Sequence, residues 1–249
     1  MTTPNNNRLT FTLWIPVLNE AGPLPEILPE IDPSWIDDIL FIDGGSTDNT
    51  IEIIKEWGHG RVIHQKEPGI ANAYWESLPH INTDVIIAYS PDGNSIASSI
   101  PTLRDKMKEG YDMVIASRYL PGAGSDDDDF MTGIGNFIFS NSIRVLFGGN
   151  FTDCLVMLRA FRKDLVEKLD MVQHDEPVFE TQLAIRSSLH NMNVTEIPVF
   201  EPKRIGGVRK MRVFYNGWSI VKLIGREWNR KMRLSLSRGA KFDASRIGE

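Results

Sequence analysis

Five apolar runs in the first half of the chain alternate with segments of helical spacing. The runs are FTLWIPV (11–17), ILFID (39–43), RVIHQ (61–65), DVIIAYS (84–90) and DMVIASR (112–118). Their apolar residues are continuous rather than alternating, as in strands that are buried on both faces. Helices between consecutive strands imply a mostly parallel sheet with right-handed crossovers. The pattern therefore predicts an α/β protein, and 249 residues are enough to bury a full core.

After residue 118 the pattern changes. LPGAGSDDDDF (120–130) is expected to be a flexible, acidic loop, in which the four carboxylates of residues 126–129 are solvated. Four adjacent carboxylates cannot all face one ion, so this run is a poor metal site. A helix is expected over residues 131–147, and the runs 155–161 and 194–200 are expected to be strands with a helix between them.

The number of cysteines and the length of the apolar runs indicate in which compartment the protein is located. Cys154 is the single cysteine, which excludes an internal disulfide and a cysteine-cluster metal site. The N-terminal residues lack the form of a signal peptide, and no apolar run approaches the roughly twenty residues of a membrane span. We therefore expect a cytoplasmic protein that can lie peripherally at a membrane.

Charge is distributed unevenly along the chain, whose net charge is −6. Residues 200–249 contain 13 Lys and Arg against 4 Asp and Glu, whereas the rest contains 14 against 29. A basic end on an acidic body favours an anionic partner: a diphosphate, a phospholipid surface or a nucleic acid. The alternative is a solvated helix face.

Two strand ends carry polar residues that suit a ligand. Asp43 ends the run 39–43 and is followed by the turn GGSTDNT, at the position where open α/β sheets bind ligands. In the second turn, SPDGNS, oxygen atoms of Asp92 and Asn94 can face one way and hold Mg²⁺ or Mn²⁺ against a diphosphate. Each stretch can also be an ordinary turn, in which Asp43 and Ser46 only satisfy backbone groups.

Several motifs occur in the order and spacing of family 2 glycosyltransferases. They are WIPVLNEAGPLPEIL, FIDGGSTDNT, PGIANAY, SPDGNS, GYDMVIASRY, DCLVMLRAFRKDLVEKL, FETQL and KRIGGVRKM. The chain most resembles the dolichol-phosphate mannosyltransferase-like branch over roughly residues 10–212. This resemblance implies a GT-A (Rossmann-like) domain over 1–212, followed by a basic amphipathic helix and tail over 213–249. It also implies transfer of a sugar from a nucleoside-diphosphate sugar, with inversion at the anomeric carbon.

The resemblance assigns the donor site residue by residue. Asp43 matches the carboxylate that reads the base, and Asp92 matches the usual direct contact to Mg²⁺ or Mn²⁺, assisted by Asn94. Ser90 replaces the first carboxylate of the Asp-x-Asp motif, so metal affinity should be weaker than in the family at large. The remaining matches to nucleotide-contacting positions are Pro16, Leu18, Asn19, Glu20, Gly69 and Asn72.

The resemblance also assigns the catalytic side. Arg204 and Lys210 match cations that neutralise the leaving diphosphate, in a loop that includes Gly207 and has Arg209 in place of serine. Asp153 and Arg159 match the segment Asp-x-x-Ser-Gly-Phe-Arg, in which Val156 and Met157 replace Ser-Gly. The candidates for a base are Asp153, Asp175, Glu176 and Glu180, although a phosphate acceptor is already anionic and needs none.

The acceptor is expected to be a polyprenyl phosphate or a glycan. One alternative is a glycosyltransferase that acts on modified nucleic acid, and another is a non-catalytic nucleotide-sugar-binding relative, favoured by the loss of the first carboxylate. A nucleotidyltransferase would need a glycine-rich, basic triphosphate loop after the first strand, and IPVLNEAG is not one. The sequence leaves the sugar, the base and the oligomeric state open.

The stretch WSIVKLIGREWNRKMRLSL (218–236) predicts an amphipathic basic helix. Its apolar positions are Trp218, Val221, Ile224, Trp228 and Met232, interleaved with the cations Lys222, Arg226, Arg230, Lys231 and Arg233. The apolar side either packs on the body or lies on an anionic membrane. At about 1 kcal/mol per cation, the second case would give salt-sensitive membrane binding.

Overall fold

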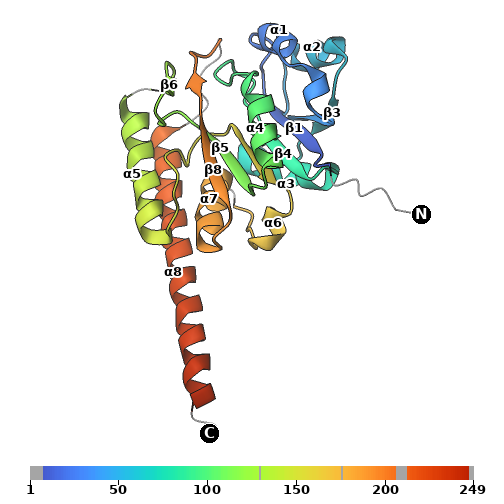
Figure 1. The fold of residues 1–249 in the computed structure, drawn as a ribbon. Helices are drawn as coiled ribbons and strands as arrows, with labels where there is room; N and C mark the ends of the chain where they lie inside the picture. The colour runs from blue at the N-terminus through green and yellow to red at the C-terminus, as the bar shows by residue number, and fades with distance from the viewer. Residues whose placement is uncertain (1–7, 129, 175, 206–211, 247–249) are drawn as a thin grey trace, which may run out of the picture.

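The computed structural model describes residues 8–128, 130–174, 176–205 and 212–246, with side chains up to Leu234. Its core is a seven-stranded sheet of order β3-β2-β1-β4-β7-β5-β8, shown in Figure 1. The strands are β1 (Phe11–Val17), β2 (Asp38–Asp43), β3 (Arg61–His64), β4 (Val85–Ala88), β5 (Met113–Ser117), β7 (Arg159–Arg162) and β8 (Val194–Pro198). Only β7 runs antiparallel to its neighbours, so the predicted mostly parallel α/β sheet is confirmed.

Helices cover both faces of the sheet, and each face has its own apolar core. Trp14, Leu40 and Ile42 pack toward one layer, whereas Leu13 and Phe41 pack toward the other. This explains the continuous apolar runs, because every strand position is covered from one side. The first layer contains α3 (Ile70–Ser77), η3 (Leu78–His80), α5 (Phe130–Phe147), α6 (Leu165–Lys168), α7 (Phe179–Leu189) and α8 (Val213–Arg246), and the second contains α1 (Leu24–Ile27), η1 (Leu28–Glu30), η2 (Pro33–Trp35), α2 (Thr50–Trp57) and α4 (Ser99–Lys108).

One edge of the sheet collects the polar strand ends. Six strands follow a common direction, and β7, which runs the other way, begins where they end; the six are β1, β2, β3, β4, β5 and β8. We call this the carboxyl edge. The segments after residues 17, 43, 88 and 117, and the segment before residue 159, therefore meet there.

A small second sheet holds the acidic segment beside the carboxyl edge. β6 (Gly124–Ser125) pairs with β9 (Phe200–Glu201) in parallel. The side chains of Asp127 and Asp128 are only 12% and 11% exposed, because each forms an ion pair with an arginine. The prediction of a solvated acidic loop is therefore wrong for these two residues, and Asp126 alone is exposed among 126–128.

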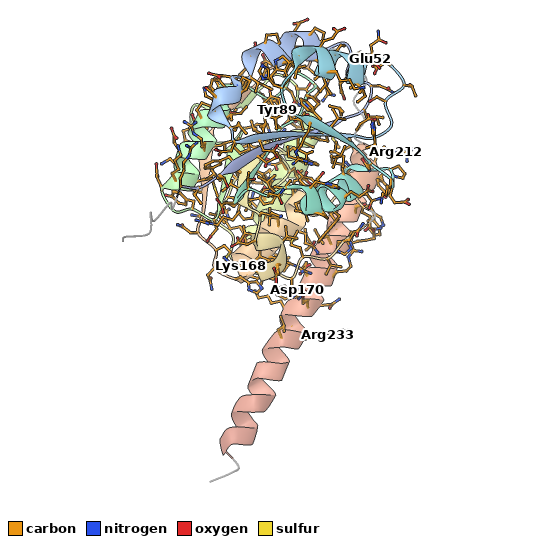
Figure 2. The ribbon with its side chains drawn as sticks, turned by 90° about the vertical axis from the view of Figure 1, so that its right-hand side faces the viewer. Glu52, Tyr89, Lys168, Asp170, Arg212 and Arg233 are labelled. Atoms are coloured by element: carbon orange, nitrogen blue, oxygen red, sulfur yellow. The ribbon has the colours of Figure 1, made fainter. Side chains whose placement is uncertain are left out.

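Helix α8 joins the body through its first half and extends beyond it (Figure 1). α8 packs on the body through Ile220 and Leu223, which are buried in the core. The predicted apolar side is not the one that packs: of its five positions Ile224 alone is partly buried, and the others are exposed, namely Trp218, Val221, Trp228 and Met232. Figure 2 labels Arg212 at the start of α8 and Arg233 near the point where the helix leaves the body. Among the described residues, no helix has the length and apolarity that crossing a bilayer requires.

Candidate active site

Two turns at the carboxyl edge are joined by hydrogen bonds around Asn19. The Asn19 amide donates to Ser46 Oγ at 3.0 Å, and its side-chain oxygen accepts the Thr47 amide at 2.8 Å. The Glu20 amide donates to Thr50 Oγ1 at 2.8 Å. Asn19 has a φ of 53°, the left-handed region that asparagine tolerates better than most residues. The predicted residues Asn19 and Glu20 are thus joined to the turn after β2 by hydrogen bonds. The side chain of Leu18 is exposed, and Pro16 lies within β1.

Asp43 ends β2 and is held by two donors. Its Oδ1 accepts the Ser46 amide at 2.9 Å, and its Oδ2 lies 3.1 Å from His64 Nδ1. Burial alone would raise the pKa of Asp43, but the bonds from Ser46 and the nearby His64 outweigh burial and lower this pKa. Asp43 is therefore an ionised carboxylate that can accept an N–H group of a nucleobase.

His64 is a candidate residue that sequence reasoning missed. The histidines are dispersed along the chain, without the spacing of metal ligands. However, His64 is the partner of Asp43 across the β2–β3 pair, and its side chain is 71% exposed next to a carboxylate that is 4% exposed. The sequence contained a signal for this pair, because Asp43 ends the predicted strand 39–43 and His64 is next to last in the following predicted strand, 61–65.

Gly69 and Asn72 lie at the start of α3, near the end of β3. Gly69 has a φ of 106°, which favours glycine, and its carbonyl accepts Gln65 Nε2 at 2.8 Å. The Asn72 side chain donates to Pro68 O and accepts from Gln173, both at 2.9 Å. Asn72 therefore connects α3 to the segment before α7.

The turn after β4 presents Asp92 to the carboxyl edge. Ser90 Oγ donates to Asp92 Oδ1 at 2.8 Å, so the residue that replaces the first carboxylate orients the second. Asp92 is 19% exposed, and Asn94 follows it on the same turn. Gly93 has a φ of 87°, and a Cβ there would lie 2.5 Å from an Ile205 side-chain carbon. The turn is therefore tightly packed beneath residues 204 and 205.

The donor atoms of this turn fit a divalent metal that shares its coordination with a diphosphate. Carboxylate, amide and hydroxyl oxygens are the ligands that Mg²⁺ and Mn²⁺ prefer. Among the described residues, no group of three or more His, Cys, Asp or Glu side chains could hold a metal. Asp92, with Asn94 and Ser90, would therefore supply only part of the coordination, as is usual for Mg²⁺ bound to phosphates.

Arg204 comes to the same turn from the segment after β9. Its guanidinium forms a two-point pair with Asp127, at 3.1 and 2.7 Å, and its Nη1 lies 3.5 Å from Asp92 Oδ2. The Ile205 amide also donates to Asp92 O at 3.0 Å. The structure thus places a predicted diphosphate-binding cation directly beside the predicted metal contact.

Arg118 gathers three carboxylates around Asp153, and sequence reasoning missed it too. It follows β5 and forms a two-point pair with Asp153, at 2.7 and 3.1 Å, and it contacts Asp128 and Glu201, both at 3.1 Å. Burial opposes the charged form, but the carboxylates outweigh it and raise the pKa of Arg118. Asp153 is fully buried, and its Oδ1 also accepts the Val156 amide at 3.2 Å.

Glu180 lies at the start of α7. Its backbone carbonyl accepts Arg159 Nη1 at 3.1 Å, and Arg159 is fully buried. Burial raises the pKa of Tyr74, and the neighbouring Glu180 raises it further. Glu180 is partly exposed, so it can be reached from solvent. The predicted residues Asp175, Gly207, Arg209 and Lys210 lie outside the described residues.

Comparison with known proteins identifies relatives along most of the chain. Residues 12–170 match the sequence model of Glycosyl transferase family 2. Glycosyltransferase AglJ of Haloferax volcanii is 29% identical over 188 residues, which are 74% of this chain and 60% of that protein. Polyprenol monophosphomannose synthase of Mycolicibacterium smegmatis is 26% identical over 237 residues, 90% of this chain and 89% of that protein.

Solved structures share the fold. Glucosyl-3-phosphoglycerate synthase from Mycobacterium tuberculosis, in complex with Mn²⁺, UDP-glucose and phosphoglyceric acid, superposes with a TM-score of 0.68 at 18% identity. The alignment covers 90% of this chain and 81% of that structure. This confirms the predicted GT-A fold. Because the matched residues 12–170 are more than half of the 249 residues, the chain belongs to glycosyl transferase family 2.

Proposed function

We propose that this chain transfers a sugar, with inversion, from a nucleoside-diphosphate sugar to a polyprenyl-phosphate acceptor. The observation that carries the proposal is the meeting of Asp43, Asp92 and Arg204 at the carboxyl edge from three separate segments. Asp43 is suited to bind the nucleobase, Asp92 the metal and Arg204 the diphosphate. A Mn²⁺ and UDP-glucose complex of a protein with this fold supports a nucleotide-sugar donor.

The donor side uses a different chemistry at each position. Asp43 accepts an N–H group of the base and thereby fixes the nucleoside. Arg204 donates to the diphosphate, whose charge grows as the sugar leaves. A bound Mg²⁺ or Mn²⁺, held by Asp92 with Asn94 and Ser90, would supply further charge stabilisation to the leaving diphosphate.

The acceptor side favours a phosphate over a hydroxyl group. Asp153 has both carboxylate oxygens bonded to Arg118, so it is a poor general base. A phosphate monoester is already anionic and needs no base. The relative named polyprenol monophosphomannose synthase supports the same acceptor class. If the acceptor is instead a glycan hydroxyl, the partly exposed Glu180 is the better base.

An apolar surface beside the site suits a lipid-linked acceptor. We call eight exposed apolar side chains, from residues 130–138 of α5 and 214–218 of α8, the α5–α8 surface. They are Phe130, Met131, Ile134, Phe137, Ile138, Phe214, Tyr215 and Trp218. The two helices pack together, as Figure 1 shows. Aromatic and aliphatic side chains gathered on amphipathic helices are typical of membrane-interface segments. We propose that this surface lies on the membrane that carries the acceptor.

The cations of α8 contribute less to this membrane contact than their number suggests. Lys222 and Arg226 pair with Glu176, and Arg230 pairs with Asp170. Paired cations attract anionic lipid or nucleic acid weakly. The same pairing reduces what these three residues would contribute to binding a nucleic acid.

A second candidate function is a nucleotide-sugar-binding protein without transfer activity, and Ser90 is the observation that favours it. The experiment that separates the two incubates the protein with Mn²⁺, radiolabelled UDP- or GDP-sugars and a polyprenyl phosphate in detergent micelles. We expect labelled lipid to form, and to be absent with Asp92→Ala. Donor binding without hydrolysis or transfer would favour the binding protein, and no donor binding would refute both.

A further inference from the structure

The acidic segment predicted to be a solvated loop instead binds the diphosphate-site arginine. Asp127 accepts Arg204 Nε at 3.1 Å on one oxygen and Nη2 at 2.7 Å on the other. This two-point geometry is the strongest form of an arginine–carboxylate pair. The bond to Asp127 is also the largest influence that raises the pKa of Arg204.

The position of Asp127 is fixed by the fold. The Asp127 and Asp128 amides donate to Ser125 Oγ at 3.2 and 2.9 Å, and Ser125 lies in the β6–β9 pair. Asp128 is itself held by Arg118. The side chains of Asp127 and Arg204 are 12% and 20% exposed, so solvent screens their pair less than it screens a surface ion pair.

The pair lies where the donor would need the arginine. The third nitrogen of the guanidinium, Nη1, is 3.5 Å from Asp92 Oδ2. A diphosphate held at Asp92 through a metal would therefore bring its oxygens next to Arg204. Asp127 uses two of the five N–H donors of the guanidinium and leaves Nη1 toward Asp92, so a diphosphate can bind beside the carboxylate, and the two anions then compete for the same positive charge.

We propose that Asp127 is a positioning residue of the donor site, which holds Arg204 in competition with the donor diphosphate. The proposal rests on the proposed function, because it takes the ligand to be a nucleoside diphosphate. Asp127 keeps the arginine in place beside Asp92, and its negative charge lowers the affinity for every anionic ligand that binds at Arg204. The released nucleoside diphosphate is one such ligand, so Asp127 favours release of that product.

The test is calorimetric titration of UDP and GDP, in the presence of Mn²⁺, into the parent, Asp127→Asn and Asp126→Asn. We expect Asp127→Asn to bind the diphosphate about threefold to tenfold more tightly, since a partly buried carboxylate no longer offsets the positive charge of Arg204. Asp126→Asn removes the same charge one residue away from an exposed position, and it should change the affinity by less than about twofold. Binding of uridine or guanosine, which lack the diphosphate, should be equal in all three proteins.

A second pair of variants checks that the effect passes through Arg204. In an Arg204→Ala background, Asp127→Asn should leave diphosphate affinity unchanged. Unchanged or weaker binding by folded Asp127→Asn, or equal tightening by Asp126→Asn, would overturn the proposal. If Asp127→Asn and Asp127→Ser both lose the native circular dichroism spectrum, Asp127 is a structural anchor and the proposal is also wrong. A parent that binds neither diphosphate would instead refute the proposed function.

Discussion

At the scale of single residues, the turn after β4 tests how much metal binding depends on the missing carboxylate. Ser90 occupies that position and donates to Asp92 Oδ1. We predict that Ser90→Asp tightens Mn²⁺ binding in the presence of UDP or GDP by about tenfold, because a second carboxylate adds charge to an oxygen site. Asp92→Asn should weaken it by at least as much. Titration of Mn²⁺ by electron paramagnetic resonance measures both, and equal affinities in all three proteins would remove this turn from the metal site.

Asp43 gives a prediction about acid stability. Its pKa is lowered in the folded protein, so the folded state favours the ionised carboxylate. The stabilisation is present at neutral pH and is lost as the pH falls below the ordinary Asp value of about 3.9 and through the lower folded-state value. We predict that the free energy of unfolding falls less steeply between about pH 5 and pH 3 in Asp43→Asn than in the parent. Urea unfolding at each pH measures this, and parallel curves would contradict it.

Sequence reasoning reached site residues whose signal is local and missed those that pair over long distances. Asp43 ends an apolar run, Asp92 follows one by two residues, and a glycine comes directly after each, so both were visible within ten residues. The pair Asp127–Arg204 joins residues 77 positions apart, and Arg118 gathers carboxylates from three different segments. Such pairs depend on which strands become neighbours, and no local pattern contains that information.

At the scale of elements, α8 is attached to α7 by a buried ion pair. Arg186 Nη2 lies 2.7 Å from Glu227 Oε1, and both side chains are under 5% exposed. Gln182 donates to the same oxygen at 3.1 Å. The amphipathic pattern predicted the helix, but Glu227 at a buried position is invisible to a pattern of apolar spacing.

We predict that Glu227→Ala lowers the free energy of unfolding by about 3–5 kcal/mol, because it leaves the Arg186 charge buried without its partner. Arg230→Ala is the matched control on the same helix. Its partner Asp170 is 78% exposed, so the loss should be about 1 kcal/mol or less. Urea denaturation measures both values. Equal losses would mean that α8 is held by its apolar contacts rather than by this pair.

The direction of β7 in the sheet is a second feature of the elements that the sequence did not predict. The run 155–161 was predicted to be a strand, and β7 (Arg159–Arg162) lies at its end. Its antiparallel insertion between β4 and β5 was not predicted, because a run buried on both faces looks alike in either direction. That insertion brings the segment before residue 159 to the carboxyl edge, and with it Asp153 to Arg118.

At the scale of the whole molecule, the carboxyl edge and the α5–α8 surface are adjacent parts of one structure. The acidic segment that binds Arg204 and Arg118 leads directly into α5 at Phe130. A membrane that contacts the start of α5 would therefore lie within a few residues of the donor site. The division into a domain over 1–212 and a separate tail stays a prediction, although Ile220 and Leu223 of α8 belong to the core of the body.

This arrangement predicts a membrane contact that depends on apolar side chains more than on charge. Phe214 and Trp218 are 86% and 63% exposed on the first turns of α8. We predict that Phe214→Ser with Trp218→Ser weakens binding to vesicles of mixed zwitterionic and anionic lipid by about tenfold, because two aromatic side chains no longer enter the interface. Val172→Ser, an exposed apolar residue outside this surface, should have no effect. Co-sedimentation with the vesicles measures all three proteins.

The salt dependence of the same binding decides between the apolar contact and the charged one. Three of the eight cations of α8 are already paired with Glu176 and Asp170, so these three attract anionic lipid only weakly. Raising the salt from about 0.05 M to about 0.5 M, which shortens the screening length several-fold, should therefore reduce binding by less than about threefold. If high salt abolishes binding while the double serine variant binds like the parent, the membrane contact is made by cations, and the α5–α8 surface is not the part that enters the lipid.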